Sequence, residues 1–277
     1  MMHRVMVIDS PRNPRVQAAL ALRERETRLA LGQTLVDGAR EALRAMNAGV
    51  AVESAFVCRS LVRTEEATLA VRTLELASAP IIEVGERVHD RLAFGNRQDG
   101  LVLVVRTETS SLDALRLGPD PLILITEDVE KPGNLGAILR TADGAGCTAV
   151  IAIGGTDLFN PNVVRASVGT VFSVPVAAAT PSDTIDWLSA HAIRPIAAVV
   201  DAATTYTDAD LRGAVALVLG SEAEGLSAAW AGTGIERVRI PMAGTADSLN
   251  VSVAAAVLAF ESRRQRDRRQ RDRRQAP

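Results

Sequence analysis

The stretch that most constrains the fold is Val251–Phe260, ten residues of which only Ser252 is polar. A helix that is apolar on nearly every side must be buried in a core or an interface. Just before it, Asp247, Ser248 and Asn250 supply more hydrogen-bonding groups than one helix cap needs. We therefore predict a cluster of polar side chains at the mouth of a buried helix, where a ligand can reach it.

The chain before this helix alternates between short apolar runs and segments with helical spacing. The runs that have the length and composition of strands are 122–126, 148–153, 171–176, 196–200, 214–219 and 237–240. The helical segments between them are 134–145, 160–167 and 182–190. This order predicts an α/β fold, with a parallel sheet covered by helices on both faces. Such a sheet binds ligands beyond the carboxyl ends of its strands, where the polar cluster falls.

Four regions are predicted along the chain. Residues 1–107 show their own alternation of short strands and helices, which predicts a separate small α/β domain. Residues 108–120 contain Ser, Thr, Gly and Pro and are predicted to be a linker. Residues 121–261 form the larger domain. Only 3% of the chain is aromatic but 47% is apolar, and a core of Ala, Val, Leu and Ile suits parallel strands.

The fourth region, residues 262–277, carries eight Arg and two Asp, a net charge of +6. The remaining 261 residues hold 23 basic and 31 acidic side chains, a net charge of −8. We predict a disordered, Arg-rich tail. A basic tail on an acidic body suits a nucleic-acid partner, but a tail that is merely solvated explains the same composition, and both interpretations stay open.

Several classes of protein are excluded. Cys58 and Cys147 stand alone and the three histidines, at 3, 89 and 191, are scattered, so neither a metal site nor a disulfide framework is predicted. No apolar run approaches the roughly 18 residues of a membrane span, and we predict a cytoplasmic protein. The glycine-rich loops that bind dinucleotides or cradle phosphates are missing. The polar residues that remain suit a reaction in which the protein mainly positions its reactants.

Three motifs carry a resemblance to a known family. They are the segment Asn134–Ala142 (NLGAILRTA), the segment Leu219–Ser227 (LGSEAEGLS) and the segment Ile240–Ala254 (IPMAGTADSLNVSVA). In this order and spacing they resemble the motifs of the SpoU (TrmH-like) branch of the SPOUT RNA methyltransferases. The resemblance covers residues 121–261 closely and residues 10–106 loosely. One departure is Lys131, where many members have Asp; this lysine could instead reach an RNA phosphate.

The resemblance implies transfer of a methyl group from S-adenosyl-L-methionine (AdoMet) to a ribose 2′-hydroxyl of RNA. Arg140 matches the catalytic arginine; because a guanidinium almost never loses a proton, we expect it to bind phosphate and stabilise the developing alkoxide. Glu222 is expected to orient Arg140, and Asn134 to position Arg140 or the acceptor. Arg165 is a weaker candidate for binding phosphate near the acceptor.

The same resemblance implies how the cofactor is held. Gly220, Ile240 and Leu249 match positions whose main-chain groups bind AdoMet in the family. Ser248 and Asn250 match the polar pair that contacts the cofactor and shapes the catalytic loop. Glycine at 220 also lets the backbone approach a ligand closely.

The family fold carries a deep trefoil knot, an exception to the near absence of knots in proteins. The resemblance also implies a homodimer formed through the C-terminal domain, with Val251–Phe260 in the interface, and an N-terminal substrate-binding domain similar to the ribosomal proteins L30e and L7Ae. The expected substrate is structured RNA, with 23S ribosomal RNA favoured over transfer RNA. A non-catalytic RNA-binding or ribosome-assembly factor is a further alternative. A nucleotide-binding enzyme of another class is disfavoured by the missing phosphate-binding loop.

Overall fold

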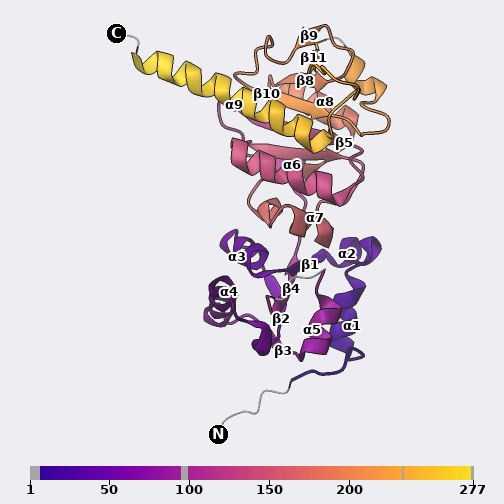
Figure 1. The fold of residues 1–277 in the computed structure, drawn as a ribbon, viewed down its shortest axis with the longest axis vertical. Helices are drawn as coiled ribbons and strands as arrows, with labels where there is room; N and C mark the ends of the chain where they lie inside the picture. The colour runs from indigo at the N-terminus through magenta and orange to yellow at the C-terminus, as the bar shows by residue number, and fades with distance from the viewer. Residues whose placement is uncertain (1–6, 95–98, 233, 276–277) are drawn as a thin grey trace. The chain divides into compact units, whose positions relative to one another are not determined.

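The computed structural model describes residues 7–94, 99–232 and 234–275, with side chains described as far as Arg268. His3 and the last two residues of the predicted tail lie outside these ranges. The chain divides into two compact units, which are described separately (Figure 1). Unit 1 comprises Met1–Glu108 and Phe159–Ser173, and unit 2 comprises Thr109–Leu158 and Val174–Pro277.

Unit 1 is built on a four-stranded sheet in the order β1-β4-β2-β3. Its strands are β1 (Gln33–Asp37), β2 (Val52–Val57), β3 (Ile81–Glu83) and β4 (Leu101–Arg106). Strand β4 pairs antiparallel with β1 and β2, and β2 pairs parallel with β3. Its helices are α1 (Pro14–Ala21), α2 (Arg25–Leu31), α3 (Ala39–Asn47), α4 (Glu65–Leu76), α5 (Glu86–Leu92) and α7 (Pro161–Ala166). The predicted small α/β domain at the N-terminus thus has its own sheet.

A segment from far along the chain completes unit 1. The Thr34 hydroxyl donates to the Phe159 carbonyl at 2.6 Å, and the Arg44 guanidinium donates to the Val168 carbonyl at 2.6 Å. Gly169 has φ +78°, and a Cβ there would lie 3.0 Å from Glu41 Cα, so the backbone needs glycine at this close approach. The predicted boundaries are linear, whereas Phe159–Ser173 lies between two strands of unit 2 in sequence and groups with unit 1 in space.

Unit 2 contains a seven-stranded sheet in the order β7-β6-β5-β10-β8-β11-β9. Its strands are β5 (Leu122–Glu127), β6 (Ala149–Ile153), β7 (Val176–Ala178), β8 (Arg194–Ala198), β9 (Thr204–Thr205), β10 (Val215–Leu219) and β11 (Glu236–Arg239). Every pairing between these strands is parallel, which confirms the predicted α/β class. The run predicted as a strand at 171–176 is instead a short 3-10 turn, Thr170–Phe172, that precedes β7.

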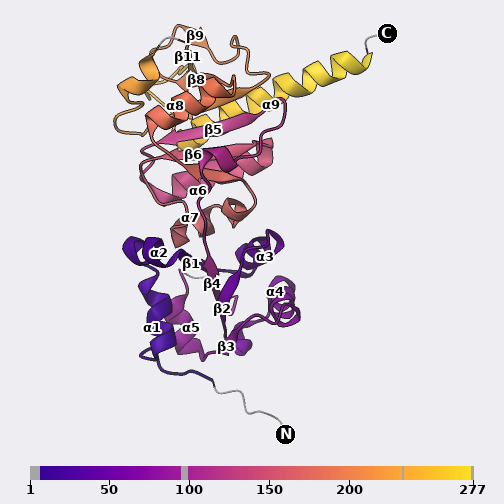
Figure 2. The ribbon, with the colours of Figure 1, turned by 180° about the vertical axis from the view of Figure 1, so that it is seen from behind.

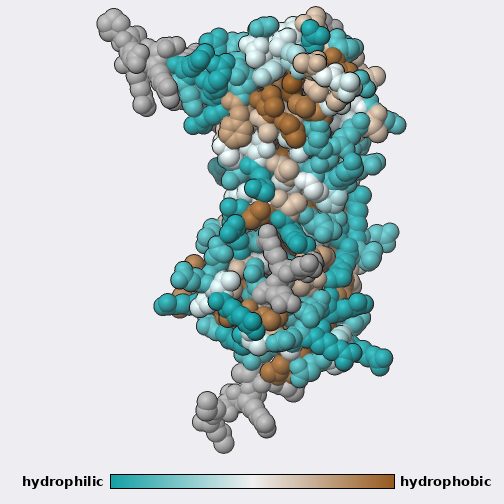
Figure 3. Space-filling view, in the orientation of Figure 1, coloured by the Kyte–Doolittle hydropathy of each residue, from teal (hydrophilic) through white to brown (hydrophobic). Residues whose placement is uncertain are grey.

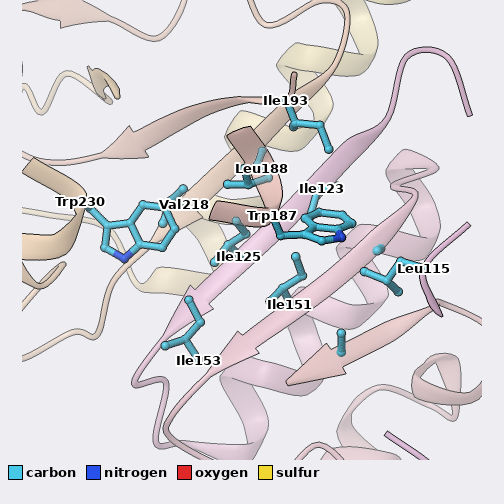
Figure 4. Close-up of a cluster of buried hydrophobic side chains, with 13 residues drawn as sticks. Leu115, Ile123, Ile125, Ile151, Ile153, Trp187, Leu188, Ile193, Val218 and Trp230 are labelled. Atoms are coloured by element: carbon cyan, nitrogen blue, oxygen red, sulfur yellow. The ribbon is translucent and has the colours of Figure 1, made fainter. Parts of the chain in front are cut away.

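Helices cover both faces of this sheet (Figures 1 and 2). Helix α6 (Pro132–Ala145) packs against α9 (Val251–Gln275), and α9 also contacts β5 and β10. Helix α8 (Pro181–Ala190) lies on the other face, where Trp187 and Trp230 join the aliphatic side chains of the central strands in one buried cluster (Figure 4). The predicted Ala, Val, Leu and Ile core is therefore closed on this side by the two tryptophans of the chain.

The prediction for the tail is wrong over most of its length. Residues 262–275 are not disordered but form the second half of helix α9. Among the helices of the described ranges, none combines the length and the apolar character needed to cross a bilayer.

The buried carboxyl of Asp37, at the end of β1, predicts how the stability of unit 1 depends on pH. Burial raises the pKa of this carboxyl to about 6, although its Oδ2 accepts a hydrogen bond from the Phe94 N–H. In the unfolded chain an aspartate ionises near pH 4. Between these values the folded state binds more protons, so this group's contribution to the free energy of unfolding falls as the pH rises from about 4 to about 6.

We expect Asp37→Asn to stabilise unit 1 relative to the unmodified protein by about 2–3 kcal/mol near pH 7.5 and by little near pH 4. The amide oxygen can still accept the Phe94 N–H. Urea unfolding followed by circular dichroism would measure the difference. Because Trp187 and Trp230 both lie in unit 2, tryptophan fluorescence provides a control transition that should not move. Parallel stability curves for the two proteins from pH 4 to 8 would contradict the assignment.

Candidate active site

The register of the parallel sheet brings four loops of unit 2 together. Strand β10 pairs with β5 on one side and with β8 on the other, so that Leu219 lies level with Thr126 and Ala198. Strand β11 continues the sheet beside β8. Because parallel strands end at the same edge, the segments 128–131, 199–203, 220–227 and 240–250 all leave the sheet there. These include the loops of the three sequence motifs.

A cavity of about 480 Å³ lies at this edge, a volume typical of small-molecule sites. It is lined by four of the predicted cofactor residues: Gly220, Ile240, Ser248 and Leu249. Asp247, which was predicted in the polar cluster before the last helix, also lines the cavity. The sequence analysis missed Met242 and the contribution of the loop after β8, which adds Val199, Val200 and Asp201. The rule that ligands bind beyond the carboxyl ends of strands could have found the loop after β8, since 196–200 was predicted as a strand.

Gly220 is required by the turn that follows it. Ser221 and Gly225 exchange two backbone hydrogen bonds of 3.0 and 3.1 Å, which folds the loop back over the end of β10. A Cβ on Gly220 would lie 2.2 Å from the Gly225 carbonyl carbon. Any side chain at 220 would therefore push this loop away from the strand and change the wall of the cavity.

The loop after β5 is held equally closely. The buried Glu127 carboxylate accepts hydrogen bonds from the Ser227 N–H and hydroxyl, both at 2.8 Å, and so joins the first loop to the end of the second motif. Asp128 has φ +52°, and a Cβ on Gly154 would lie 2.0 Å from its Oδ1. Glycine after β6 thus makes room for the strained turn that leads into α6.

The side chain of Glu222 is the point where the three motifs meet. Its carboxylate accepts from Lys131 Nζ at 2.7 Å, from Asn134 Nδ2 at 3.0 Å and from Asn250 Nδ2 at 2.5 Å. The Val251 N–H also donates to it, at the start of α9. The hydrogen bond from Lys131 is the largest effect that lowers the pKa of Glu222, so the carboxylate is ionised at neutral pH.

The two asparagines of this cluster are also bonded to each other and to the helix start. Asn250 Nδ2 donates to Asn134 Oδ1 at 3.2 Å, and Asn250 Oδ1 accepts from the Ser252 N–H at 3.0 Å and from its hydroxyl at 2.6 Å. Asn250 therefore serves as the cap of α9 and as a member of the polar cluster at once. Predicted residues Asn134, Glu222 and Asn250 are thus brought together, and Lys131 joins them.

Arg140 is not part of this cluster. The expected pairing of Glu222 with Arg140 is not made within the described part of this chain, where the Glu222 carboxylate accepts from Lys131 and the two asparagines instead. Six residues along a helix place Arg140 about 120° around α6 from Asn134. Its side chain is exposed, is not among the residues that line the cavity, and has no hydrogen bond or ion pair within the described part of the chain.

Arg165, which the sequence placed near the acceptor, belongs to α7 in unit 1. There its charge is one of the effects that lower the pKa of Asp37, against the larger effect of burial. The described residues contain no group of three or more His, Cys, Asp and Glu that could hold a metal ion.

Comparisons with known proteins agree with this geometry. Residues 121–260 match the SpoU rRNA Methylase family, and residues 13–102 match the MRM3-like substrate binding domain. The 23S rRNA (uridine(2479)-2′-O)-methyltransferase of Streptomyces viridochromogenes is 32% identical over 268 residues, which is 90% of this chain and 88% of that protein. The 23S rRNA (guanosine-2′-O-)-methyltransferase RlmB of Bordetella pertussis is 38% identical over 197 residues, covering 66% of this chain and 80% of that protein.

Solved structures are similar over nearly the whole chain. A crystal structure described as an RNA 2′-O ribose methyltransferase is 42% identical, with a TM-score of 0.83, and covers 94% of this chain and 99% of that one. An AdoMet-bound rRNA methyltransferase from Sinorhizobium meliloti is 28% identical, with a TM-score of 0.85, and covers 95% and 98%. The resemblance drawn from the three motifs is confirmed, and the chain belongs to the SpoU rRNA methylase family.

Proposed function

We propose that this protein is an AdoMet-dependent methyltransferase that modifies a ribose 2′-hydroxyl of 23S ribosomal RNA. The observation that carries the proposal is the cavity at the carboxyl edge of the sheet, which is lined by residues of the second and third motifs. One of these lining residues, Glu222, is hydrogen bonded to Asn134 of the first motif and to Asn250 of the third. The names of the relatives that span most of the chain support ribosomal RNA over transfer RNA. We expect the protein to act in the cytoplasm, which cell fractionation would test.

The residues that line the cavity fit AdoMet, which supplies an electrophilic methyl group on a positively charged sulfonium. Asp201, Glu222, Glu224 and Asp247 place four carboxylates around the cavity, which favours a cationic ligand. Main-chain groups at Gly220, Ile240 and Leu249, together with the Ser248 side chain, are proposed to hold the cofactor. The loop returns so closely over Gly220 that no side chain fits there, which defines this wall of the cavity.

Arg140 and Asn134 are proposed to act on the RNA. The exposed guanidinium of Arg140 can bind a phosphate and stabilise negative charge on the reacting oxygen, a role that needs no proton loss. Asn134 is held by Glu222 and Asn250, and we propose that it positions the acceptor ribose. Glu222 is proposed to orient the two asparagines rather than Arg140.

A homodimer is proposed through the face formed by α6 and the first half of α9. Val253 and Phe260 are 47% and 50% exposed on α9, and hydrophobic side chains gather over this part of the helix in Figure 3. Phe260 also lies beside Gly144 of α6, where a Cβ would be 3.5 Å from its ring. Because Arg140 lies on α6 but outside the cavity of its own chain, we propose that dimerisation brings it to the cavity of the partner.

The trefoil knot is proposed on the path of the chain after β11. Strand β11 lies between β8 and β9 near one edge of the sheet, whereas α9, which follows directly, packs on α6, β5 and β10. The segment 240–250 must therefore return across the sheet, and we propose that it threads a loop on the way. An experimental structure in which the segment 240–250 passes through no loop would contradict this proposal.

The function is tested by transfer of labelled methyl groups from AdoMet to ribosomal RNA that lacks the modification, followed by digestion to nucleosides. We expect label in a 2′-O-methylated nucleoside of 23S RNA. Label only in transfer RNA would keep the reaction and change the substrate. No label, together with no AdoMet binding by calorimetry, would favour a non-catalytic RNA-binding factor.

In the same assay, Arg140→Ala and Asn134→Ala are expected to lower kcat by about 10²–10³-fold, the usual loss when a group that stabilises the transition state is removed. AdoMet affinity should stay close to that of the unmodified protein for Arg140→Ala, since Arg140 does not line the cavity. Arg72→Ala, at an exposed position of α4, serves as the control. Full activity of both site variants would refute the assignment.

The cluster at Glu222 has its own test. Glu222→Gln would set an amide nitrogen against the Lys131 ammonium, so we expect AdoMet affinity to fall about tenfold, or about 1.4 kcal/mol. Lys131→Gln should weaken AdoMet binding less, and Lys131→Arg should stay near the unmodified protein, since it keeps the charge. If Lys131→Gln instead weakened only RNA binding, Lys131 would be an RNA contact and not the partner that positions Glu222.

If α6 and the first half of α9 form the dimer interface, the double variant Val253→Asp, Phe260→Asp should be a monomer in analytical ultracentrifugation. Each chain would otherwise bury two charges in the interface without partners. Methyl transfer should be lost with the dimer. Leu76→Asp, at a 79% exposed apolar position of unit 1, is the matched control and should leave the oligomeric state unchanged. A stable dimer of the double variant would place the interface elsewhere.

A further inference from the structure

The second half of α9 has a composition unlike the rest of the helix. After Phe260 it contains no apolar residue as far as Gln275, and the sequence Arg-Gln-Arg-Asp-Arg occurs twice in succession, at 264–268 and 269–273. A segment of this kind has no hydrophobic face with which to pack, and most helices in proteins depend on such packing. Its helical structure therefore needs another explanation.

Three side chains anchor the start of this half to unit 2. The buried Ser262 hydroxyl donates to the Leu211 carbonyl at 2.7 Å. The Gln265 amide accepts from the Leu211 N–H at 2.9 Å and donates to the Ala209 carbonyl at 3.1 Å. Two side chains one helical turn apart thus bind the backbone groups of Ala209 and Leu211.

Arg266 is the strongest anchor. Its guanidinium donates to the carbonyls of Gly213 at 2.5 Å, Asp120 at 2.7 Å and Pro121 at 3.4 Å. Burial lowers the pKa of Arg266, which still remains charged at neutral pH. These contacts hold the helix to the segments before β5 and β10. They therefore fix the direction in which the rest of α9 extends from these segments.

The anchored arginine differs from its neighbours. Arg263, Arg264 and Arg268 are exposed. Arg263 pairs with Asp267 at 3.1 Å, and Arg264 pairs with Glu261 at 2.5 Å. The guanidinium groups of both pairs are exposed, although the Glu261 side chain is largely buried, so these pairs support the helix weakly and leave the arginines accessible to other anions. Arg266 is thus a structural arginine, whereas Arg263, Arg264 and Arg268 face solvent.

Both ribbon views show α9 extending past the sheet of unit 2 (Figures 1 and 2). Residues 262–277 carry eight Arg and two Asp, whereas the other 261 residues carry an excess of acidic side chains. A polyanion is the partner that such a basic extension fits. A repeat of five residues turns by about 140° around a helix, so arginines are distributed around the axis and do not form one face suited to reading bases.

We propose that the second half of α9 is an RNA-binding arm that contacts the phosphate backbone of the substrate without reading its sequence. This proposal rests on the proposed function in one respect, namely that the substrate is RNA. The arm would raise the affinity for RNA and fix its approach to the domain that carries the cavity, while the three motifs select the reacting nucleotide.

The test uses the full chain with Arg268, Arg269, Arg271, Arg273 and Arg274 changed together to Gln, which keeps helix propensity and leaves all three anchors intact. The control has Lys at the same five positions, which keeps the charge. Binding to an unmodified 23S RNA transcript is measured between about 50 and 200 mM salt. Circular dichroism and AdoMet calorimetry should be the same for all three proteins.

We expect the Gln variant to bind RNA about tenfold or more weakly at the lower salt concentration, with the slope of log K against log salt reduced by about 3, as expected for the loss of about four phosphate contacts. The Lys variant should keep most of the affinity and slope. An unchanged affinity and slope in the Gln variant would overturn the proposal, as would an equal loss in the Lys variant. A change of oligomeric state with RNA binding unaltered would show that the arm binds a second copy of the chain, which also overturns it.

The failure of this proposal is distinguishable from the failure of the proposed function. If the unmodified protein methylates 23S RNA and the Gln variant binds RNA equally well, only the arm is refuted. If the unmodified protein transfers no methyl group but the Gln variant loses RNA affinity, the arm stands and the enzymatic function is refuted.

Discussion

One ionised carboxylate, that of Glu222, accepts hydrogen bonds from the loop before α6 and from the loop before α9 while it sits in the loop after β10. Without it, Lys131 Nζ and Asn134 Nδ2 would lose the acceptor they share, and Asn250 Nδ2 would keep only its longer hydrogen bond to Asn134 Oδ1. The parallel register of β5, β10 and β8 makes this meeting possible, since it ends these strands at one level. The geometry of the cavity thus depends on a polar contact that no single motif contains.

Closely packed backbone surrounds the hydrogen bonds of Glu222. Gly220 and Gly154 stand where a Cβ would collide with a neighbouring loop, and Glu127 ties the end of β5 to Ser227. These features pack the loops closely where the cofactor is proposed to bind, which agrees with a reaction that depends on positioning more than on covalent work by the protein. Arg140 remains free of such restraints, as suits a group that has to meet a substrate.

Helix α9 takes part in the polar cluster, in the core of unit 2 and in both proposed surfaces. Its start is capped by Asn250 and completes the polar cluster, and its apolar half covers the sheet and presents Val253 and Phe260 to solvent. Its basic half is held by Ser262, Gln265 and Arg266 and carries the proposed RNA-binding arm. One continuous helix therefore links the proposed cofactor site, the proposed dimer face and the proposed RNA-binding arm.

The α/β class, the parallel sheet, the family and five residues of the cavity wall (Gly220, Glu222, Ile240, Ser248 and Leu249) were predictable from the sequence, because periodicity and motif spacing are local properties. The tertiary structure was needed to show that, within the chain, Glu222 pairs with Lys131 and not with Arg140, since that depends on the rotation of α6 about its axis and on which loops meet. It also decided that Phe159–Ser173 groups with unit 1 and that residues 262–275 are helical. These outcomes depend on hydrogen bonds to backbone groups of distant segments, such as the carbonyls bound by Arg266, which composition does not encode.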